Sequence, residues 1–168
     1  MVVYFSPMSE PPVAPERTEL SLLALFAGWA MTGEVQRRLG EDGFGDLRFN
    51  DGFVVQHVLA GPLTVSALAE RMGVTQQAAS KAVADLDRRG VLTRKPAPDD
   101  ARARLLELTE FGRASVAATR RHRAALESEM EAEWGADRVA DARALLAEIL
   151  RRLGGTEAVK QRRVRPPA

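Results

Sequence analysis

The sequence contains no cysteine, few aromatic residues and no long apolar run, and each absence excludes a class of structure or function. Without thiols the chain can form no disulfide, no zinc–thiolate site and no thiol redox sensor. Aromatic residues make up only 5% of the chain, which favours helices packed through small residues over a β-sandwich. No apolar run approaches the roughly 20 residues that a membrane-spanning helix needs. We therefore expect a cytoplasmic protein with no membrane partner.

Residue patterns typical of enzymes are also missing. The chain has no glycine-rich phosphate loop and no nucleophile elbow. Its only histidines, His57 and His122, lack a second histidine or acidic residue at the i+4 spacing that would let one helix face hold a metal. A structural role is therefore favoured for both. We expect no catalytic residue, no metal site and no cofactor, and hence a protein that is not an enzyme.

Both ends of the chain have the composition of tails. The start, MVVYFSPM, lacks the basic stretch of a signal peptide and is too short for one, and Met8 is an alternative start to Met1. A proline-rich run follows it, so we expect a flexible N-terminal tail over residues 1–15. Residues 155–168 include VKQRRVRPPA and are expected to form a flexible basic tail.

Charge is unevenly distributed along a chain whose formal net charge is only +1. Residues 1–60 hold 4 basic and 8 acidic residues, residues 61–110 hold 8 and 7, and residues 111–168 hold 12 and 8. The basic C-terminal part is compatible with a polyanionic partner, but it does not identify one.

Apolar helices are expected near both ends of the chain. Between about residues 16 and 39, apolar side chains cover nearly the whole circumference, so this helix cannot lie alone on a surface. A long helix over 109–134 and an amphipathic helix over 137–153 follow near the C-terminus. We expect the regions 16–45 and 113–154 to form a homodimer interface through Leu22, Phe26, Leu145, Leu146, Ile149 and Leu153.

The stretch 73–92, GVTQQAASKAVADLDRRGVL, predicts a helix with one buried face and one polar face. Thr75 can cap its start and Gly90 can close its end. The first turns of the polar face carry Gln76, Gln77, Ser80 and Lys81. A helix over 46–60 and a short helix capped by Thr64 precede it. The short helix and the polar helix are joined by a tight glycine turn and form a helix-turn-helix. The second helix of this motif is the recognition helix.

A change of period after this helix predicts two strands. Residues 91–109 have the pattern of a strand, a polar tip and a second strand, which is a β-hairpin. A hairpin directly after a helix-turn-helix is a wing. It carries four cations: Arg94, Lys95, Arg102 and Arg104.

These motifs resemble the MarR (multiple antibiotic resistance regulator) family of winged-helix transcription factors. The helix-turn-helix part of the resemblance lies in Leu68-Ala69-Glu70, Gly73-Val74, Ser80, and Leu86 ahead of Gly90. The wing part lies in Asp100-Ala101-Arg102 and Leu108-Thr109-Glu110-Phe111-Gly112. The match covers about residues 63–112 and departs from the family at Ala101, where a basic residue is common.

The resemblance implies a mainly α fold: a winged helix-turn-helix DNA-binding domain, 46–112, with a small β-hairpin wing, flanked by N- and C-terminal dimerisation helices. It implies a homodimeric regulator of transcription that binds double-stranded DNA at a pseudo-palindrome, more commonly as a repressor. Arg102 would reach the minor groove from the wing tip, with Asp99 or Asp100 holding the loop. It further implies a small aromatic or phenolic effector near Trp29, Phe53, His57 and Arg120.

The chemistry of the polar face supports the same hypothesis. Glutamine amides such as Gln76 and Gln77 can bind adenine bidentately in the major groove, and Lys81 can reach guanine or a phosphate. Thr75 and Thr64, at helix starts, are placed to hold phosphates.

Each of these sites has a structural alternative. The polar face could simply be solvated, and Asp99 and Asp100 could be turn formers. Trp29 could be a core or dimer contact, and Arg120 could pair with nearby acidic residues or be solvated. The alternative function is a winged-helix module for protein–protein interaction without specific DNA readout, which would favour apolar residues where this sequence has amides and cations.

Overall fold

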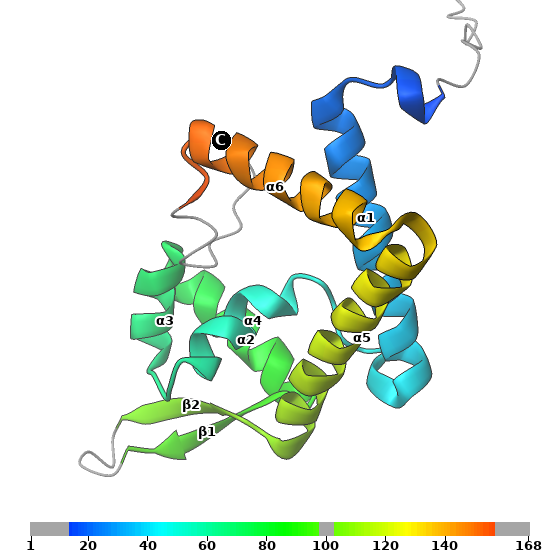
Figure 1. The fold of residues 1–168 in the computed structure, drawn as a ribbon. Coiled ribbons are helices and arrows are strands. Elements are labelled where there is room, and N and C mark those ends of the chain that lie inside the picture. Colours follow the sequence, from blue (N-terminus) through cyan, green and yellow to red (C-terminus); the bar gives the residue numbers. More distant parts are fainter. Residues whose placement is uncertain (1–13, 98–102, 157–168) are drawn as a thin grey trace, which may run out of the picture.

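The computed structural model describes residues 14–97 and 103–156. These residues form a mainly helical fold with one two-stranded antiparallel sheet (Figure 1). The elements are α1 (Leu20–Leu39), α2 (Asp51–Leu59), α3 (Val65–Met72), α4 (Gln76–Arg88), β1 (Leu92–Pro96), β2 (Arg104–Leu108), α5 (Glu110–Trp134) and α6 (Ala136–Arg152). The expectations for Arg102, Asp99, Asp100, both start methionines and most of the two tails lie outside the described residues. Within the described ranges, no helix is long and apolar enough to cross a bilayer.

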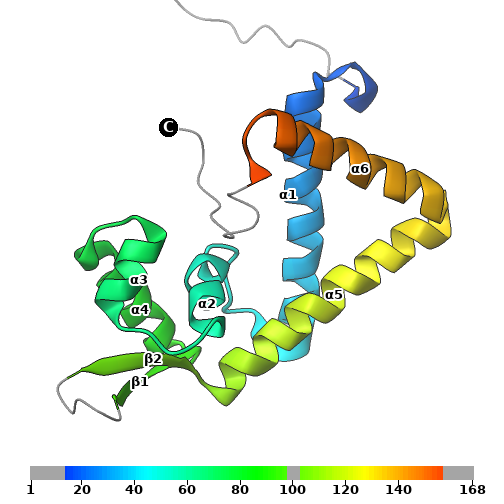
Figure 2. The ribbon, with the colours of Figure 1, turned by 60° about the vertical axis from the view of Figure 1, so that its left-hand side comes forward.

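The elements gather into two parts (Figures 1 and 2). Helices α2, α3 and α4 and the hairpin form a compact group at one side of the molecule. Helices α1, α5 and α6 form the other part. Helix α5 leads away from the hairpin, and α6 turns back from its far end.

Helix α1 begins later than the sequence predicts, at Leu20 instead of about residue 16. Residues Pro15–Arg17 form a single 3-10 turn, and Thr18 and Glu19 then have extended ψ angles of 140°. At its other end α1 leads into a wider turn, η2 (Gly40–Phe44), which is kinked at Gly43, where φ is 86°, and which leads the chain toward α2.

Helix α2 also begins later, at Asp51 instead of residue 46. The segment before it forms hydrogen-bonded turns: the Arg48 amide donates to Asp51 Oδ2 at 2.7 Å, and the Asp51 amide donates to the Arg48 carbonyl at 3.0 Å. Asp51 therefore organises the chain just before the helix and opens the helix itself. A side-chain bond of this local kind leaves no trace in hydrophobic periodicity, which explains the difference.

Both caps predicted for the helix-turn-helix are confirmed. Thr64 Oγ1 accepts from the Ala67 amide and Thr75 Oγ1 accepts from the Ala78 amide, each at 3.2 Å. Between the two helices Gly73 has φ 62°, the left-handed conformation that glycine adopts without steric penalty. This turn keeps the connection between the end of α3 and the start of α4 short.

The hairpin is paired in register from Leu92↔Leu108 to Pro96↔Arg104. An isolated bridge between Leu63 and Leu106 adds one residue of the α2–α3 connection to its edge. Leu92, Leu106 and Leu108 are buried, so one face of the hairpin covers the core. The wing is therefore attached to the helix-turn-helix by both backbone and side-chain contacts.

The joint between wing and α5 explains the glycine of the Leu-Thr-x-x-Gly pattern. A Cβ on Gly112 would lie 2.1 Å from the carbonyl oxygen of Val91. Thr109 locks the same place, because its Oγ1 donates to the Val91 carbonyl at 3.2 Å and accepts from the Gly112 amide at 2.9 Å. The first turn of α5 thus rests on the backbone at the start of β1, which only glycine permits.

Two apolar clusters correspond to the two parts of the fold. The larger lies within the winged part and includes Leu68, Val83, Leu86, Val91 and Leu106, all 0–1% exposed. The smaller lies between α1 and α5 and consists of Val35, Leu39 and Ala118, with Phe44 and Leu126 against it. Helix α6 contributes no buried residue.

Candidate nucleic-acid interface

The first turns of α4 present the polar face that the sequence predicts. Gln76, Gln77 and Lys81 are exposed and Ser80 is half-buried. The opposite face is fixed in the core through Ala79, Val83 and Leu86, each at most 1% exposed. The polar side chains are therefore held on a rigid helix and directed away from the protein.

Thr64 and Thr75 lie at the starts of α3 and α4, where they cap the helices. Each hydroxyl oxygen accepts a backbone amide. A threonine hydroxyl also has one proton to donate, so capping does not prevent Thr75 from binding a phosphate oxygen. Thr64 Oγ1 is in addition 3.0 Å from Ser66 Oγ, and either hydroxyl can donate in this hydrogen bond.

The cations of the wing do not share one face, because paired residues of a hairpin point to the same side and successive residues alternate. Arg94 pairs with Leu106 in the register, and Pro96 with Arg104, so Arg94 and Arg104 extend the face that includes the buried leucines. Lys95 pairs with Leu105 and projects from the opposite face.

The same cations differ in their ion pairs. Lys95 Nζ is 2.7 Å from Glu107 Oε2, a diagonal neighbour on its own face. Arg94 is 3.7 Å from Asp87 of α4. Arg104 is exposed, and within the described residues it makes no ion pair. Of the three described wing cations, Arg104 therefore has the charge most available to an external anion. Arg102 lies outside the described residues.

Sequence reasoning missed a cluster of charged residues where α4 ends beside the start of α2. It consists of Arg48, Asp51, Asp85, Arg88 and Arg89. The hydrogen bond from Arg88, followed by the charges of Arg89 and Arg48, lowers the pKa of the Asp85 carboxyl. The hydrogen bonds that Arg89 donates to the Asp51 carboxylate raise the pKa of the Arg89 guanidinium. The only sequence signal is an Asp four residues before an Arg, which is common on helix surfaces.

The residues expected to surround an effector lie on three helices. Trp29 on α1 is 60% exposed and makes an edge-to-face contact with Phe26. Phe53 on α2 makes a similar contact with Phe49, and half-buried His57 lies one turn further along. Arg120 is exposed on α5. Trp29 thus contacts Phe26 and Phe53 contacts Phe49, so these ring contacts do not bring Trp29 and Phe53 together.

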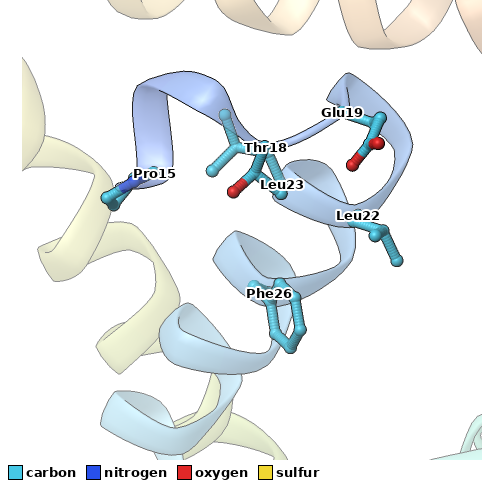
Figure 3. A pocket seen from close by; sticks show the side chains of 6 residues that line it. All are labelled: Pro15, Thr18, Glu19, Leu22, Leu23 and Phe26. Atoms are coloured by element: carbon cyan, nitrogen blue, oxygen red, sulfur yellow. The ribbon is translucent and has the colours of Figure 1, made fainter. Parts of the chain in front are cut away.

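An open apolar groove of about 450 Å³ lies at the start of α1 (Figure 3). It is lined by six residues: Pro15, Thr18, Glu19, Leu22, Leu23 and Phe26. None of the four expected effector residues lines it. Two of the expected dimer residues, Leu22 and Phe26, do.

The residues expected at a dimer interface are mostly exposed in the single chain. Leu22, Phe26, Leu145, Leu146 and Leu153 have exposures of 45% to 78%, and Ile149 is half-buried. By contrast His122 is anchored, with Nε2 2.7 Å from Asp42 Oδ2, in agreement with the structural role expected for it. Among the described residues no group of three or more histidine or acidic side chains could hold a metal ion.

The helix-turn-helix followed by a β-hairpin defines a winged-helix protein, and comparison with known proteins supports this. Residues 47–103 match the sequence model of the MarR family. No curated protein sequence matches the chain. Among solved structures, YusO from Bacillus subtilis is 24% identical with a TM-score of 0.62, over 79% of this chain and 92% of that one.

Two further solved structures have the same fold. A point mutant of MepR from S. aureus, bound to an oligodeoxyribonucleotide, is 19% identical with a TM-score of 0.60, over 81% of this chain and 99% of that one. Apo MarR from E. coli is 22% identical with a TM-score of 0.56, over 79% and 98%. The match to the MarR family model is thus confined to residues 47–103, and the solved structures show that the chain has their winged-helix fold.

Proposed function

We propose that this protein is a homodimeric regulator of transcription that binds a pseudo-palindromic site in double-stranded DNA, and that it acts as a repressor. The observation that carries the proposal is the exposed face at the start of α4, where two glutamine amides and a lysine project from a helix whose other face is buried. The major groove of B-DNA admits an α-helix and presents base edges that such side chains can bind.

The contacts follow from the placement of the residues. Gln76 and Gln77 bind base edges, and Ser80 and Lys81 extend the contact by one turn of α4. Thr64 and Thr75 bind phosphates at the helix starts. The wing contributes Arg94, Arg102 and Arg104, and Lys95 joins them only if its pair with Glu107 opens. The solved complex of MepR with an oligodeoxyribonucleotide supports this use of the fold.

The exposed apolar side chains of α1 and α6 support the dimer. Phe26, Trp29, Leu145 and Leu153 are each more than half exposed in the single chain. A soluble monomer rarely leaves so many large apolar side chains exposed to water. A two-fold dimer would cover them and place two α4 helices on half-sites one helical turn of DNA apart, or a multiple of it.

We further propose that an aromatic or phenolic effector binds near Trp29, Phe53, His57 and Arg120 and releases the DNA. Release requires that the effector binds better to the form with low DNA affinity. The test uses a Trp134→Phe variant, in which Trp29 is the only tryptophan. Saturable quenching of Trp29 fluorescence by a phenolic acid, together with loss of bound duplex, is the expected result. Quenching without loss of duplex would contradict release.

The proposed function is tested by selecting bound duplexes from a random double-stranded pool at two salt concentrations. We expect an enriched pseudo-palindrome and an affinity that falls steeply with salt, because the cations of α4 and the wing displace counterions from phosphates. A folded dimer that enriches no sequence would instead favour a winged module for protein–protein contact.

A further inference from the structure

One arginine, Arg89, joins the end of α4 to the start of α2. Its Nη1 donates to Asp51 Oδ2 at 2.6 Å and its Nη2 donates to Asp51 Oδ1 at 2.8 Å, which is a bidentate pair. Nη2 also donates to Asp85 Oδ2 at 2.7 Å, and Nη1 to the carbonyl oxygen of Asp46 at 2.9 Å. A single guanidinium thus holds three segments: the turn before α2, the first residue of α2 and the last turn of α4.

This arrangement is shielded from water, unlike most ion pairs of the molecule. The side chains of Arg89 and Asp51 are 13% and 12% exposed. The neighbouring Arg88, whose side chain is 74% exposed, pairs only with Asp85 among the described residues. Exposed pairs of the second kind contribute little to a structure, whereas a bidentate arginine fork fixes both distance and orientation.

Because Arg89 lies at the C-terminal end of α4, a small tilt of the helix there causes a large displacement at its N-terminal end. Helix α4 has 13 residues, which makes it about 20 Å long, so a tilt of about 10° at one end moves the other by roughly 3 Å. Hydrogen bonds to base edges tolerate displacements of only about 0.5 Å. Gln76 and Gln77 lie at the end of α4 opposite Arg89.

The apolar core holds α4 in place but does not fix its angle as well, because apolar contacts have no directional preference. Directional contacts between α4 and the segment that opens α2 come mainly from Arg89. A second one, from Arg48 Nη1 to Asp85 Oδ2, is longer at 3.3 Å and comes from a side chain that is 68% exposed.

We propose that Arg89 is a positioning residue: it sets the angle at which α4 enters the groove and thereby the selectivity for base sequence, without touching DNA itself. The proposal rests on the DNA-binding function proposed above.

The experiment compares Arg89→Lys with Arg88→Lys, two neighbouring changes that keep the charge and remove the guanidinium. The affinity of each folded dimer is measured for the selected duplex and for a scrambled duplex of the same length and composition, at one salt concentration. For Arg89→Lys we expect the affinity for the selected duplex to fall about tenfold, the size of one lost base contact, while the affinity for the scrambled duplex stays within about twofold. Arg88→Lys should leave both affinities unchanged.

The base-preference profile separates positioning from a purely structural role. A structural defect lowers the fraction of active protein and both affinities alike, whereas a tilted α4 relaxes the preference at the bases that Gln76 and Gln77 read. A folded Arg89→Lys variant with an unchanged ratio of the two affinities, or with equal losses in both, would overturn the proposal.

A second variant keeps the test decisive if Arg89→Lys does not fold. Asp51→Asn leaves the arginine and its bond to Asp85 in place but weakens its attachment to α2. We expect a smaller relaxation of the same base preferences, and a folded Asp51→Asn variant with an unaltered profile overturns the proposal. Wild-type protein that prefers no duplex would show instead that the proposed function itself is wrong.

Discussion

The winged part and the terminal helices of this molecule are built differently. The winged part buries one large cluster, in which leucines and valines such as Leu68, Val83 and Leu106 are completely covered. Helix α6 buries none of its residues, and the outer half of α1 leaves Phe26 and Trp29 at 53% and 60% exposure. The winged part thus has a completely buried apolar core. The outer half of α1 and helix α6 carry apolar side chains too, but no other part of the described chain buries them. The difference indicates where a second copy of the chain would be needed.

The largest effect on stability should come from replacing a leucine by alanine, and this replacement should act differently in the two parts. Leu68→Ala removes a side chain that is 0% exposed, so we expect the free energy of unfolding to fall by about 2–5 kcal/mol. Leu146→Ala, at 46% exposure, should instead weaken the proposed dimer. Chemical denaturation at several protein concentrations separates the two. A Leu146→Ala variant whose stability and dimerisation both equal those of the wild type would show that this face of α6 has no partner.

A slightly smaller effect is expected at the joint of the wing and α5. Gly112→Ala places a Cβ against the Val91 carbonyl, and such overpacking costs about 1–3 kcal/mol. Gly52→Ala is the matched control, because nothing lies within 4 Å of a Cβ there. Thermal melting compares the two variants. Equal melting temperatures would mean that the backbone at Gly112 shifts without cost.

Within the wing, the two faces of the hairpin should differ in their effect on DNA. Arg104→Gln removes an exposed charge that has no ion-pair partner among the described residues, so we expect weaker binding and a salt slope lower by about 1. The double variant Lys95→Gln/Glu107→Gln removes a pair that is already neutral and should leave affinity and slope unchanged. Titrations of duplex binding at several salt concentrations measure both. A double variant as weak as Arg104→Gln would place Lys95 in the interface.

The smallest effect concerns acid stability in the terminal part. Hydrogen bonds from Arg37, and then from Arg38, lower the pKa of Glu34 from 4.5 to about 2. A carboxyl with a lowered pKa stabilises the folded state above its ordinary pKa and loses that contribution as pH falls toward the folded value. Between about pH 4.5 and 3 the melting temperature of Glu34→Gln should therefore fall less steeply than that of the wild type. Parallel curves would show that the pair persists in the unfolded chain.

Local signals predicted the winged part well. Thr64 and Thr75 stand where caps are needed, and the pattern of a strand, a polar tip and a second strand marks the hairpin, because these features depend on residues close in sequence. The starts of α1 and α2 were predicted too early along the chain. There the extended ψ angles of Thr18 and Glu19 and the side-chain bond of Asp51 end the helical pattern, although the apolar spacing continues.

The candidate site was only partly accessible to the same reasoning. The polar face of α4 follows from helical spacing, but the division of the wing cations between two faces depends on the register of the hairpin. The Arg89–Asp51 pair joins residues 38 positions apart, and nothing in the sequence of either segment requires it. Contacts of this range are decided by how the elements pack.

The contact between Gly112 and Val91 separates two kinds of information in this sequence. The glycine that helps to mark the chain as a winged-helix protein is required by a backbone-to-backbone approach and has no side chain with which to meet DNA. Gln76 and Gln77 are on the open side of a helix and support nothing in the core. The side chains on the open face of α4 can therefore be exchanged without disturbing the contact at Gly112, so a change in the proposed base preference requires no change of fold.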